Sequence, residues 1–274
     1  MSRAFPVLLV AATAVSLTFL LLPIVAIFLR IPPGDLLAQL GSDAARDALV
    51  VTLKTNAVAN VLILAFGTPT AYLLASRRLR GRALAITLVE LPLVLPPAVA
   101  GIGLIAAFGR FGLLGDTFDV LGVQIAFTQL AVVLAITFVA SPFYVRSAIA
   151  AFEAVDENLV AAARTLGAGP ARTFFRVALP LAAGGLGAGW ALAFARGIGE
   201  FGATLMFAGS LQGVTQTLSL AVYEQFDVDF DVALAIGAEL VVVSALVLLA
   251  VKLVPAWTRS GSSSTTLFAP SASR

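Results

Sequence analysis

The sequence predicts an all-α membrane protein with six transmembrane helices and with both termini in the cytoplasm. Hydrophobic residues make up 60% of the 274 positions and charged residues only 12%, whereas a soluble domain has about 25% charged residues. The mean hydropathy is +1.02. Apolar runs recur along the chain, each long enough to cross a bilayer at about 1.5 Å of rise per residue. These observations exclude an ordinary soluble domain.

The composition also excludes several kinds of site within the chain. There is no Cys and no His, which removes thiol nucleophiles, imidazole bases, disulfides and the usual zinc sites, so we expect no metal site. A P-loop needs a lysine directly after a glycine, but Lys54 and Lys252 both follow apolar residues. We therefore expect no cofactor in this chain. The small net charge of +2 argues against a nucleic acid partner.

The N-terminal part, residues 1–47, is predicted to contain one membrane helix and an outer loop. The apolar run Ala4–Leu29 follows Arg3. A secretory signal peptide is the alternative interpretation, but its apolar region would have about 7–15 residues, so we read this longer run as a retained helix. Residues 30–47 contain two prolines, two glycines and several charges and are predicted to be the loop.

The core, residues 48–255, contains the five other predicted spans. Asn56 and Asn60 lie one turn apart in the second span and are expected to hydrogen-bond between helices rather than line a pore. Residues 256–274 are predicted to form a short, disordered cytoplasmic tail. The predicted spans are Thr55–Ala75, Leu84–Phe108, Val123–Tyr144, Leu181–Met206 and Val232–Val254, with loops at 109–122 and 224–231.

The distribution of basic residues predicts the orientation, because short cytoplasmic loops are rich in Lys and Arg. With the N-terminus inside, only four basic residues lie outside: Arg30, Arg46, Lys54 and Arg110. Segment 156–180 is then cytoplasmic. The basic residues placed inside are Arg3, Arg77, Arg78, Arg80, Arg82, Arg146, Arg164, Arg172, Arg176, Lys252, Arg259 and Arg274.

Segment 156–167 has the features of a short amphipathic helix between the fourth and fifth spans. Asp156 is a good N-cap residue, and Gly167 can adopt the left-handed conformation that ends a helix. Pro170 is placed to begin a second short helix, and Pro180 marks the entry to the fifth span. The helix could pack against its own bundle or dock on a soluble partner. One apolar stripe is formed, at helical spacing, by Leu159, Ala162, Ala163 and Leu166.

This segment resembles the cytoplasmic coupling motif of type I ABC importer permeases. The family motif is E-A-A, a glycine four residues after the second alanine, a spacer, and then a hydrophobic residue, any residue, Leu and Pro. Ala161 stands where the family usually has glutamate, which predicts that docking depends on apolar packing more than on charge. The matching residues are Ala162, Ala163, Gly167, Leu179 and Pro180.

Within that family, the chain resembles the molybdate and tungstate permeases of the sulfate/molybdate group. Four ordered stretches carry the resemblance: E-L-P-L-V-L-P-P-A-V-A-G at 90–101, F-V-A-S-P-F-Y-V-R-S-A at 138–148, F-A-R-G-I-G-E-F-G-A-T-L-M-F-A-G at 194–209 and T-Q-T-L-S-L-A-V-Y at 215–223.

The resemblance implies an inner-membrane permease that is not itself an enzyme. Two copies would form the pore, and two ATPase subunits on the cytoplasmic side would bind ATP and magnesium. An extracytoplasmic binding protein would deliver the oxyanion, which alternating access would carry across the membrane. The implied ATPase-coupling residues are Asp156, Leu159, Ala161, Ala162, Ala163, Arg164, Leu166 and Gly167.

The third and fifth spans are predicted to line the pathway, since breaks in membrane helices are tolerated where protein or water covers the backbone. Plain packing kinks are the alternative. Arg196 and Glu200, four residues apart, are expected to share one helix face, either as a mutual ion pair only or with Arg196 also attracting the anion. The pathway candidates are Pro92, Pro96, Pro97, Arg196, Gly199, Glu200, Gly202 and Thr204.

Three other functions are considered. A sulfate or tungstate importer of the same family is the first alternative to a molybdate importer. A secondary transporter would use ion-coupling carboxylates such as Glu90, Glu200 or Glu239, but the coupling motif argues against it. An intramembrane enzyme is disfavoured, because every Asp lies in a predicted loop and neither Lys lies deep in a span.

Overall fold

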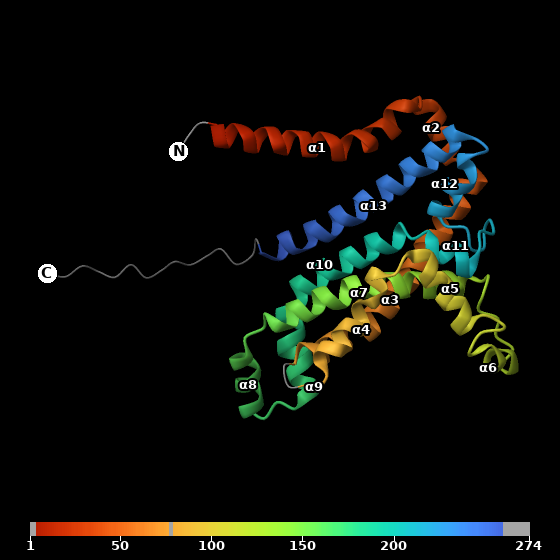
Figure 1. Cartoon of the computed structure of the whole chain (residues 1–274). Helices are drawn as coiled ribbons and strands as arrows, with labels where there is room; N and C mark the ends of the chain where they lie inside the picture. Colours follow the sequence, from red (N-terminus) through yellow and green to blue (C-terminus); the bar gives the residue numbers. More distant parts are fainter. Residues whose placement is uncertain (1–3, 77–78, 260–274) are drawn as a thin grey trace.

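The computed structural model describes residues 4–76 and 79–259, and every regular element in these ranges is helical (Figure 1). A π-helical turn, Phe174–Ala178, joins α9 to α10. The helices are α1 (Ala4–Arg30), α2 (Pro33–Leu40), α3 (Asp43–Ala75), α4 (Arg82–Val94), α5 (Pro97–Phe108), α6 (Gly115–Val120), α7 (Gln129–Glu153), α8 (Glu157–Thr165), α9 (Pro170–Thr173), α10 (Leu179–Ile198), α11 (Gly202–Ala208), α12 (Leu218–Phe226) and α13 (Phe230–Arg259).

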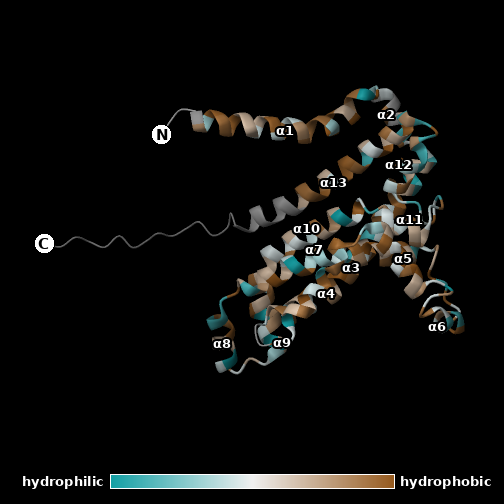
Figure 2. Cartoon of the chain, viewed as in Figure 1, coloured by the Kyte–Doolittle hydropathy of each residue, from teal (hydrophilic) through white to brown (hydrophobic). Residues whose placement is uncertain are grey.

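Five helical segments in the described ranges are long and apolar enough to cross a membrane. The bent pair α4–α5 makes a sixth when it is counted as one span. Figure 2 shows that apolar residues dominate these long helices, whereas α8 carries hydrophilic positions. The predicted all-α membrane fold is therefore confirmed.

The core forms around α7, with α3 and α10 packed along it. Fully buried side chains of α3 and α7, such as Ile63, Ile136 and Tyr144, fill the space between these helices. Glycines let the helices approach closely: a methyl group at Gly67 would lie 2.9 Å from the Tyr144 ring, and one at Gly189 would lie 2.7 Å from the Cβ of Ser147. By contrast, no residue in the apolar window of α1 is buried, and α1 lies apart from the bundle (Figure 1).

The loop predicted at residues 30–47 is wrong, because helices occupy most of it. Pro33 begins α2, which is possible since proline lacks only an N–H that is unpaired in the first helical turn. Asp43 begins α3, and the Ser42 hydroxyl caps this helix by accepting from the Ala45 N–H at 3.3 Å. The second span therefore starts about three turns before the predicted Thr55.

The fourth span is shifted relative to the prediction Val123–Tyr144. Helix α7 begins only at Gln129, because Thr128 is extended and Phe127 has a positive φ of 61°. It then continues to Glu153, so Arg146 lies inside the helix rather than after its end. The Arg146 Nε lies 3.7 Å from a carboxylate oxygen of Glu90 in α4.

The third and fifth predicted spans are both interrupted. Helices α4 and α5 meet at an angle of 113°, with the break at Leu95 and Pro96. Helix α10 ends at Ile198, and α11 starts at Gly202. At its other end, the fifth span runs on from α9 through the π-helical turn, so Pro180 does not mark its beginning. The wider turn lets the helix pass a residue that cannot donate a backbone hydrogen bond.

Two smaller differences complete the fold. The loop predicted at 109–122 contains the short helix α6. Helix α13 continues to Arg259, so the first residues of the tail predicted at 256–274 are helical. The predicted disorder of residues 260–274 lies outside the described residues.

Candidate functional site

The helices that follow the breaks in the third and fifth spans, α5 and α11, pack directly against each other. Helix α11 lies on α5, and the contact is close enough to require glycine. A methyl group at Gly202 would lie 2.9 Å from the Cβ of Pro97, and one at Gly101 would lie 2.7 Å from the Cβ of Met206. The structure thus brings Pro97 and Gly202, predicted from separate spans, into one contact.

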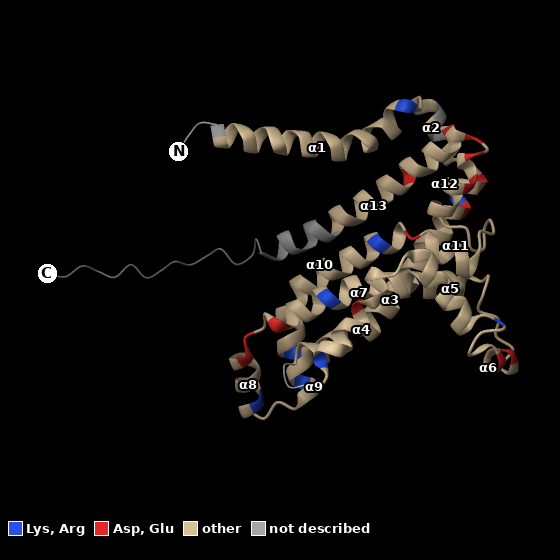
Figure 3. Cartoon of the chain, in the orientation of Figure 1, with Lys and Arg blue, Asp and Glu red and all other residues tan. Residues whose placement is uncertain are grey.

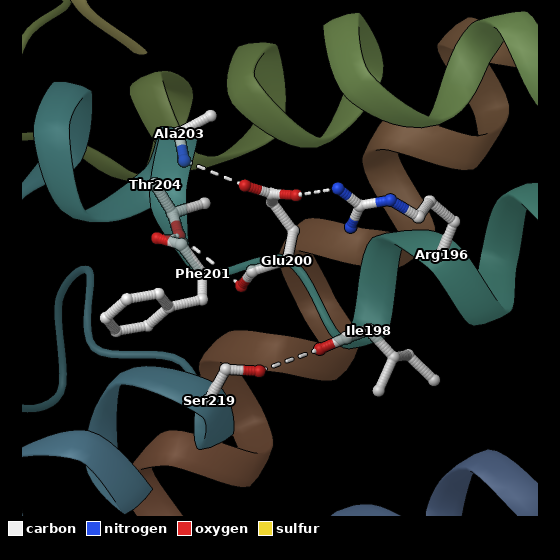
Figure 4. A network of polar contacts seen from close by, with 7 residues as sticks. All are labelled: Arg196, Ile198, Glu200, Phe201, Ala203, Thr204 and Ser219. Carbon is white, nitrogen blue, oxygen red and sulfur yellow. Dashed lines mark hydrogen bonds and ion pairs between the residues drawn. The ribbon is translucent and has the colours of Figure 1, made fainter. Parts of the chain in front are cut away.

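Glu200 lies at the centre of the break between α10 and α11 (Figure 4). Only 1% of its side chain is exposed, and one carboxylate oxygen lies 2.7 Å from an Arg196 guanidinium nitrogen. The other oxygen accepts from the Ala203 N–H at 2.8 Å, which caps the start of α11. The predicted ion pair is confirmed. The reason given for it was wrong, because Glu200 lies beyond the end of α10 and not on its face.

Two hydroxyl groups donate to backbone carbonyls beside this break. The Thr204 hydroxyl donates to the Phe201 carbonyl at 2.8 Å, and the Ser219 hydroxyl donates to the Ile198 carbonyl at 3.3 Å (Figure 4). Thr204 is fully buried. Among the predicted pathway residues, Arg196 keeps 27% of its side chain exposed, so it is the charged group of this site that reaches open space.

Asn56 joins α3 to α10 immediately beside this site. Its amide donates to the Phe194 carbonyl at 3.2 Å, and the Asn60 amide donates to the Asn56 carbonyl at 2.8 Å. The hydrogen bonding expected of Asn56 between helices is confirmed. Asn60 bonds within its own helix and does not reach another one. The close approach requires Gly197, where a methyl group would lie 2.3 Å from the Asn56 side-chain oxygen.

We expect Gly197→Ala to destabilise the protein by about 1–3 kcal/mol, because the added methyl group overpacks the contact with Asn56 and Ile136. Thermal unfolding of the purified protein measures this. Gly187→Ala is the matched control, since the same methyl group on the same helix would meet nothing within 4 Å. Equal melting temperatures for the two variants would contradict the prediction.

Helix α8 confirms the local features predicted for segment 156–167. The Asp156 carboxylate accepts from the Asn158 N–H at 2.8 Å, and Gly167 has a φ of +82°. Leu159 is 49% exposed and Leu166 is 88% exposed. The two leucines of the predicted stripe are therefore not covered by their own bundle.

The other side of α8 borders a cavity of about 850 Å³ between this helix and the ends of α3 and α7. Ala161 and Arg164 line the cavity together with Tyr72, Phe152 and Val155. Ala161 therefore lies beside the space between α8 and the bundle, whereas Leu166 lies on the exposed stripe. A longer side chain at position 161 has room within this cavity.

Among the ion pairs that the sequence analysis missed, two join distant segments. Arg82 pairs with Glu153 and also donates from Nε to the Leu74 carbonyl at 2.6 Å, which ties the ends of α3, α4 and α7 together. The second pair is Arg146 with Glu90. The sequence shows Arg82 in a basic loop and Arg146 and Glu90 in apolar runs, but the residues around each arginine do not indicate which carboxylate it pairs with.

Comparisons with known proteins identify the family of this chain. Residues 65–260 match the family model described as "Binding-protein-dependent transport system inner membrane component". The chain is 46% identical, over 86% of its length and 89% of the relative's, to the molybdenum transport system permease protein ModB of Mycobacterium tuberculosis. It is 42% identical to ModB of Escherichia coli K12, over 66% of this chain and 80% of that one.

Solved structures show the same fold. A bacterial alginate ABC transporter, crystallised with an alginate-bound periplasmic protein, aligns with a TM-score of 0.69 and 15% identity, covering 90% of this chain and 92% of that one. The inward-facing MetNI methionine ABC transporter aligns with a TM-score of 0.62 and 19% identity, covering 77% and 94%. From the family match and the identity to the ModB proteins, the chain belongs to the family of binding-protein-dependent transport system inner membrane components and is a multi-pass inner-membrane protein.

Proposed function

We propose that this chain is the membrane-spanning permease subunit of an ATP-driven molybdate importer. The observation that carries the proposal is the 46% identity to ModB permeases over most of both chains. A sulfate or tungstate importer is the alternative, since these tetrahedral dianions resemble molybdate. A secondary transporter is disfavoured. It would need carboxylates that couple to an ion, but Glu90 and Glu200 are each paired with an arginine.

The proposed complex contains two copies of this chain and two separate ATPase subunits, which bind ATP and magnesium. An extracytoplasmic binding protein delivers the oxyanion. The end of the bundle that carries α8 and α9 faces the cytoplasm in this proposal. Several basic positions lie at that end, around α9, whereas acidic positions lie around α12 at the other end (Figure 3), and this distribution supports the proposed orientation.

Alternating access is proposed to act at the two broken spans. ATP binding would close the ATPase dimer and move α8, and the pore would open outward; hydrolysis would reset it inward. Helices α5 and α11 can move as a unit because they pack against each other through Gly101 and Gly202. We assign the lining and gating to Pro92, Pro96, Pro97, Arg196, Gly199, Glu200, Gly202 and Thr204.

Uptake into proteoliposomes tests the function directly. The purified complex with its cognate binding protein should import labelled molybdate when ATP is enclosed, and molybdate should be imported faster than sulfate. Preferential sulfate or tungstate uptake would select the alternative substrate. Uptake driven by an ion gradient without ATP would contradict the ABC importer.

Ala98→Cys should react with a water-soluble thiol reagent to an extent that depends on ATP. Ala98 is half-buried at the start of α5, beside the proposed gate, and the chain has no other cysteine. Fully buried Thr204 is less suitable as a probe. Phe111→Cys, at a fully exposed position beyond α5, should react in every state. Constant reactivity of Ala98→Cys across nucleotide states would contradict gating at this break.

Ala161→Glu should leave assembly and transport within a few-fold of the parent, because the cavity beside α8 can accept the longer side chain. Co-purification with the ATPase and molybdate uptake measure the two effects. Complete loss of assembly would show that a small residue is required at this position.

A further inference from the structure

Arg146 is a charged residue inside a membrane-spanning helix whose side chain is mostly uncovered. It lies about 10 Å before the end of α7 by the helical rise. Its side chain is 72% exposed and that of Glu90 is 37% exposed, and the two approach only through Nε at 3.7 Å. Most N–H groups of the guanidinium group therefore make no contact with the Glu90 carboxylate.

Such a group cannot face the hydrocarbon part of a bilayer without a large cost, and charged residues within spans generally face water or protein. The exposed side of α7 at Arg146 is therefore expected to face an aqueous path or a second copy of the chain. The same argument applies to Arg196, which keeps 27% of its side chain exposed.

The packing of α7 against α10 places the two arginines on the same side of this helix pair. The helices are antiparallel: methyl groups at Gly185, Gly189 and Gly197 of α10 would contact Ala151, Ser147 and Ile136 of α7 in turn. Arg146 directly precedes the contact residue Ser147, and Arg196 directly precedes the contact residue Gly197. In antiparallel helices, residues one position before the contact stripe point to the same side.

The register also gives the separation of the two arginines. Ser147 lies opposite Gly189, so Arg146 is level with residue 190 of α10. Arg196 lies six residues farther along α10, or about 9 Å at the helical rise. Figure 3 shows basic positions on both α7 and α10.

We propose that Arg146 and Glu90 form a second anion-binding site on the translocation path. The first site is the Arg196–Glu200 pair, and the second lies nearer α8. The proposal rests on the proposed function and adds a site to it. Each arginine is balanced by one carboxylate, so a tetrahedral dianion is attracted but not held tightly. Passage through a pore requires sites that bind well enough to admit an ion and weakly enough to release it.

Chemical restoration of the charge tests the inference. The variant Arg146→Cys with Glu90→Gln contains no unpaired buried charge and introduces the only cysteine of the chain. It is studied in the complete complex with cysteine-free partners, after co-purification has verified assembly. We expect molybdate uptake to fall about tenfold, and a cationic methanethiosulfonate reagent to restore it about fivefold. A neutral reagent of similar size should not restore it.

The control variant is Arg82→Gln with Glu153→Gln, which neutralises the other ion pair between α4 and α7. This control should not show the tenfold fall in molybdate uptake. The apparent KM for molybdate should rise in the Arg146 variant and not in the control. Equal restoration by neutral and cationic reagents would overturn the inference. So would failure of either reagent to react in every nucleotide state, which would place Arg146 in a dry contact between copies.

The parent complex separates this inference from the proposed function. Import of molybdate by the parent establishes the function before any variant is compared. If the parent imports a different oxyanion, that anion replaces molybdate in the assay and the inference is still tested. A parent complex that imports no oxyanion contradicts both.

Discussion

Leu166→Asp is expected to prevent stable assembly with the ATPase while leaving the permease able to insert. Leu166 is 88% exposed, which is unfavourable for a leucine at the end of a capped helix unless a partner covers it. Docking of α8 into a groove of the ATPase would bury this side chain. An aspartate would then lose its hydration without a partner, and affinity should fall by about 100-fold or more.

Co-purification of the ATPase with the permease measures this effect, and transport-coupled ATP hydrolysis provides a second readout. Leu113→Asp is the matched control, since Leu113 is 89% exposed in the segment after α5, far from α8 in the sequence. This control should retain the ATPase. Normal co-purification and normal coupled hydrolysis with Leu166→Asp would contradict the assignment of α8 as the docking helix.

The features that the sequence predicted correctly are those encoded locally. Asp156 and Gly167 terminate α8 as expected because a cap and a left-handed glycine depend on only a few neighbouring residues. The membrane helices were recognised because hydropathy is summed over a whole span. The Arg196–Glu200 pair was also predictable, because its two residues are only four positions apart in the sequence, although helix α10 ends between them.

The features that the sequence did not predict depend on distant packing. Proline had opposite effects at two positions: Pro96 lies at a 113° break, whereas a π-helical turn lets the fifth span continue past Pro180. The propensity of proline is the same at both positions, so the surroundings decide the result. Likewise, Arg146 suggested the end of a span because its partner, Glu90, is far away in the sequence.

The second large effect is expected from neutralising the charges at the break in the fifth span. Arg196→Gln combined with Glu200→Gln should fold and assemble but should import molybdate about tenfold more slowly than the parent. The amide oxygen introduced at position 200 can still accept from the Ala203 N–H, so the cap on α11 is retained. The exposed fraction of Arg196, 27%, leaves part of its positive charge available to an anion.

The double variant is required because either single substitution leaves a charge without its partner. An unpaired charge within a span costs roughly 2.5–3.5 kcal/mol on insertion scales, and this would reduce function whatever the role of the pair. Initial rates of molybdate uptake, normalised to the amount of assembled complex, measure the effect. If the ion pair only offsets the cost of its own burial, the double variant will transport at nearly the parental rate. A reduced rate with unchanged assembly instead identifies Arg196 as the group that balances the charge of the dianion, with Glu200 holding it in place and limiting the affinity.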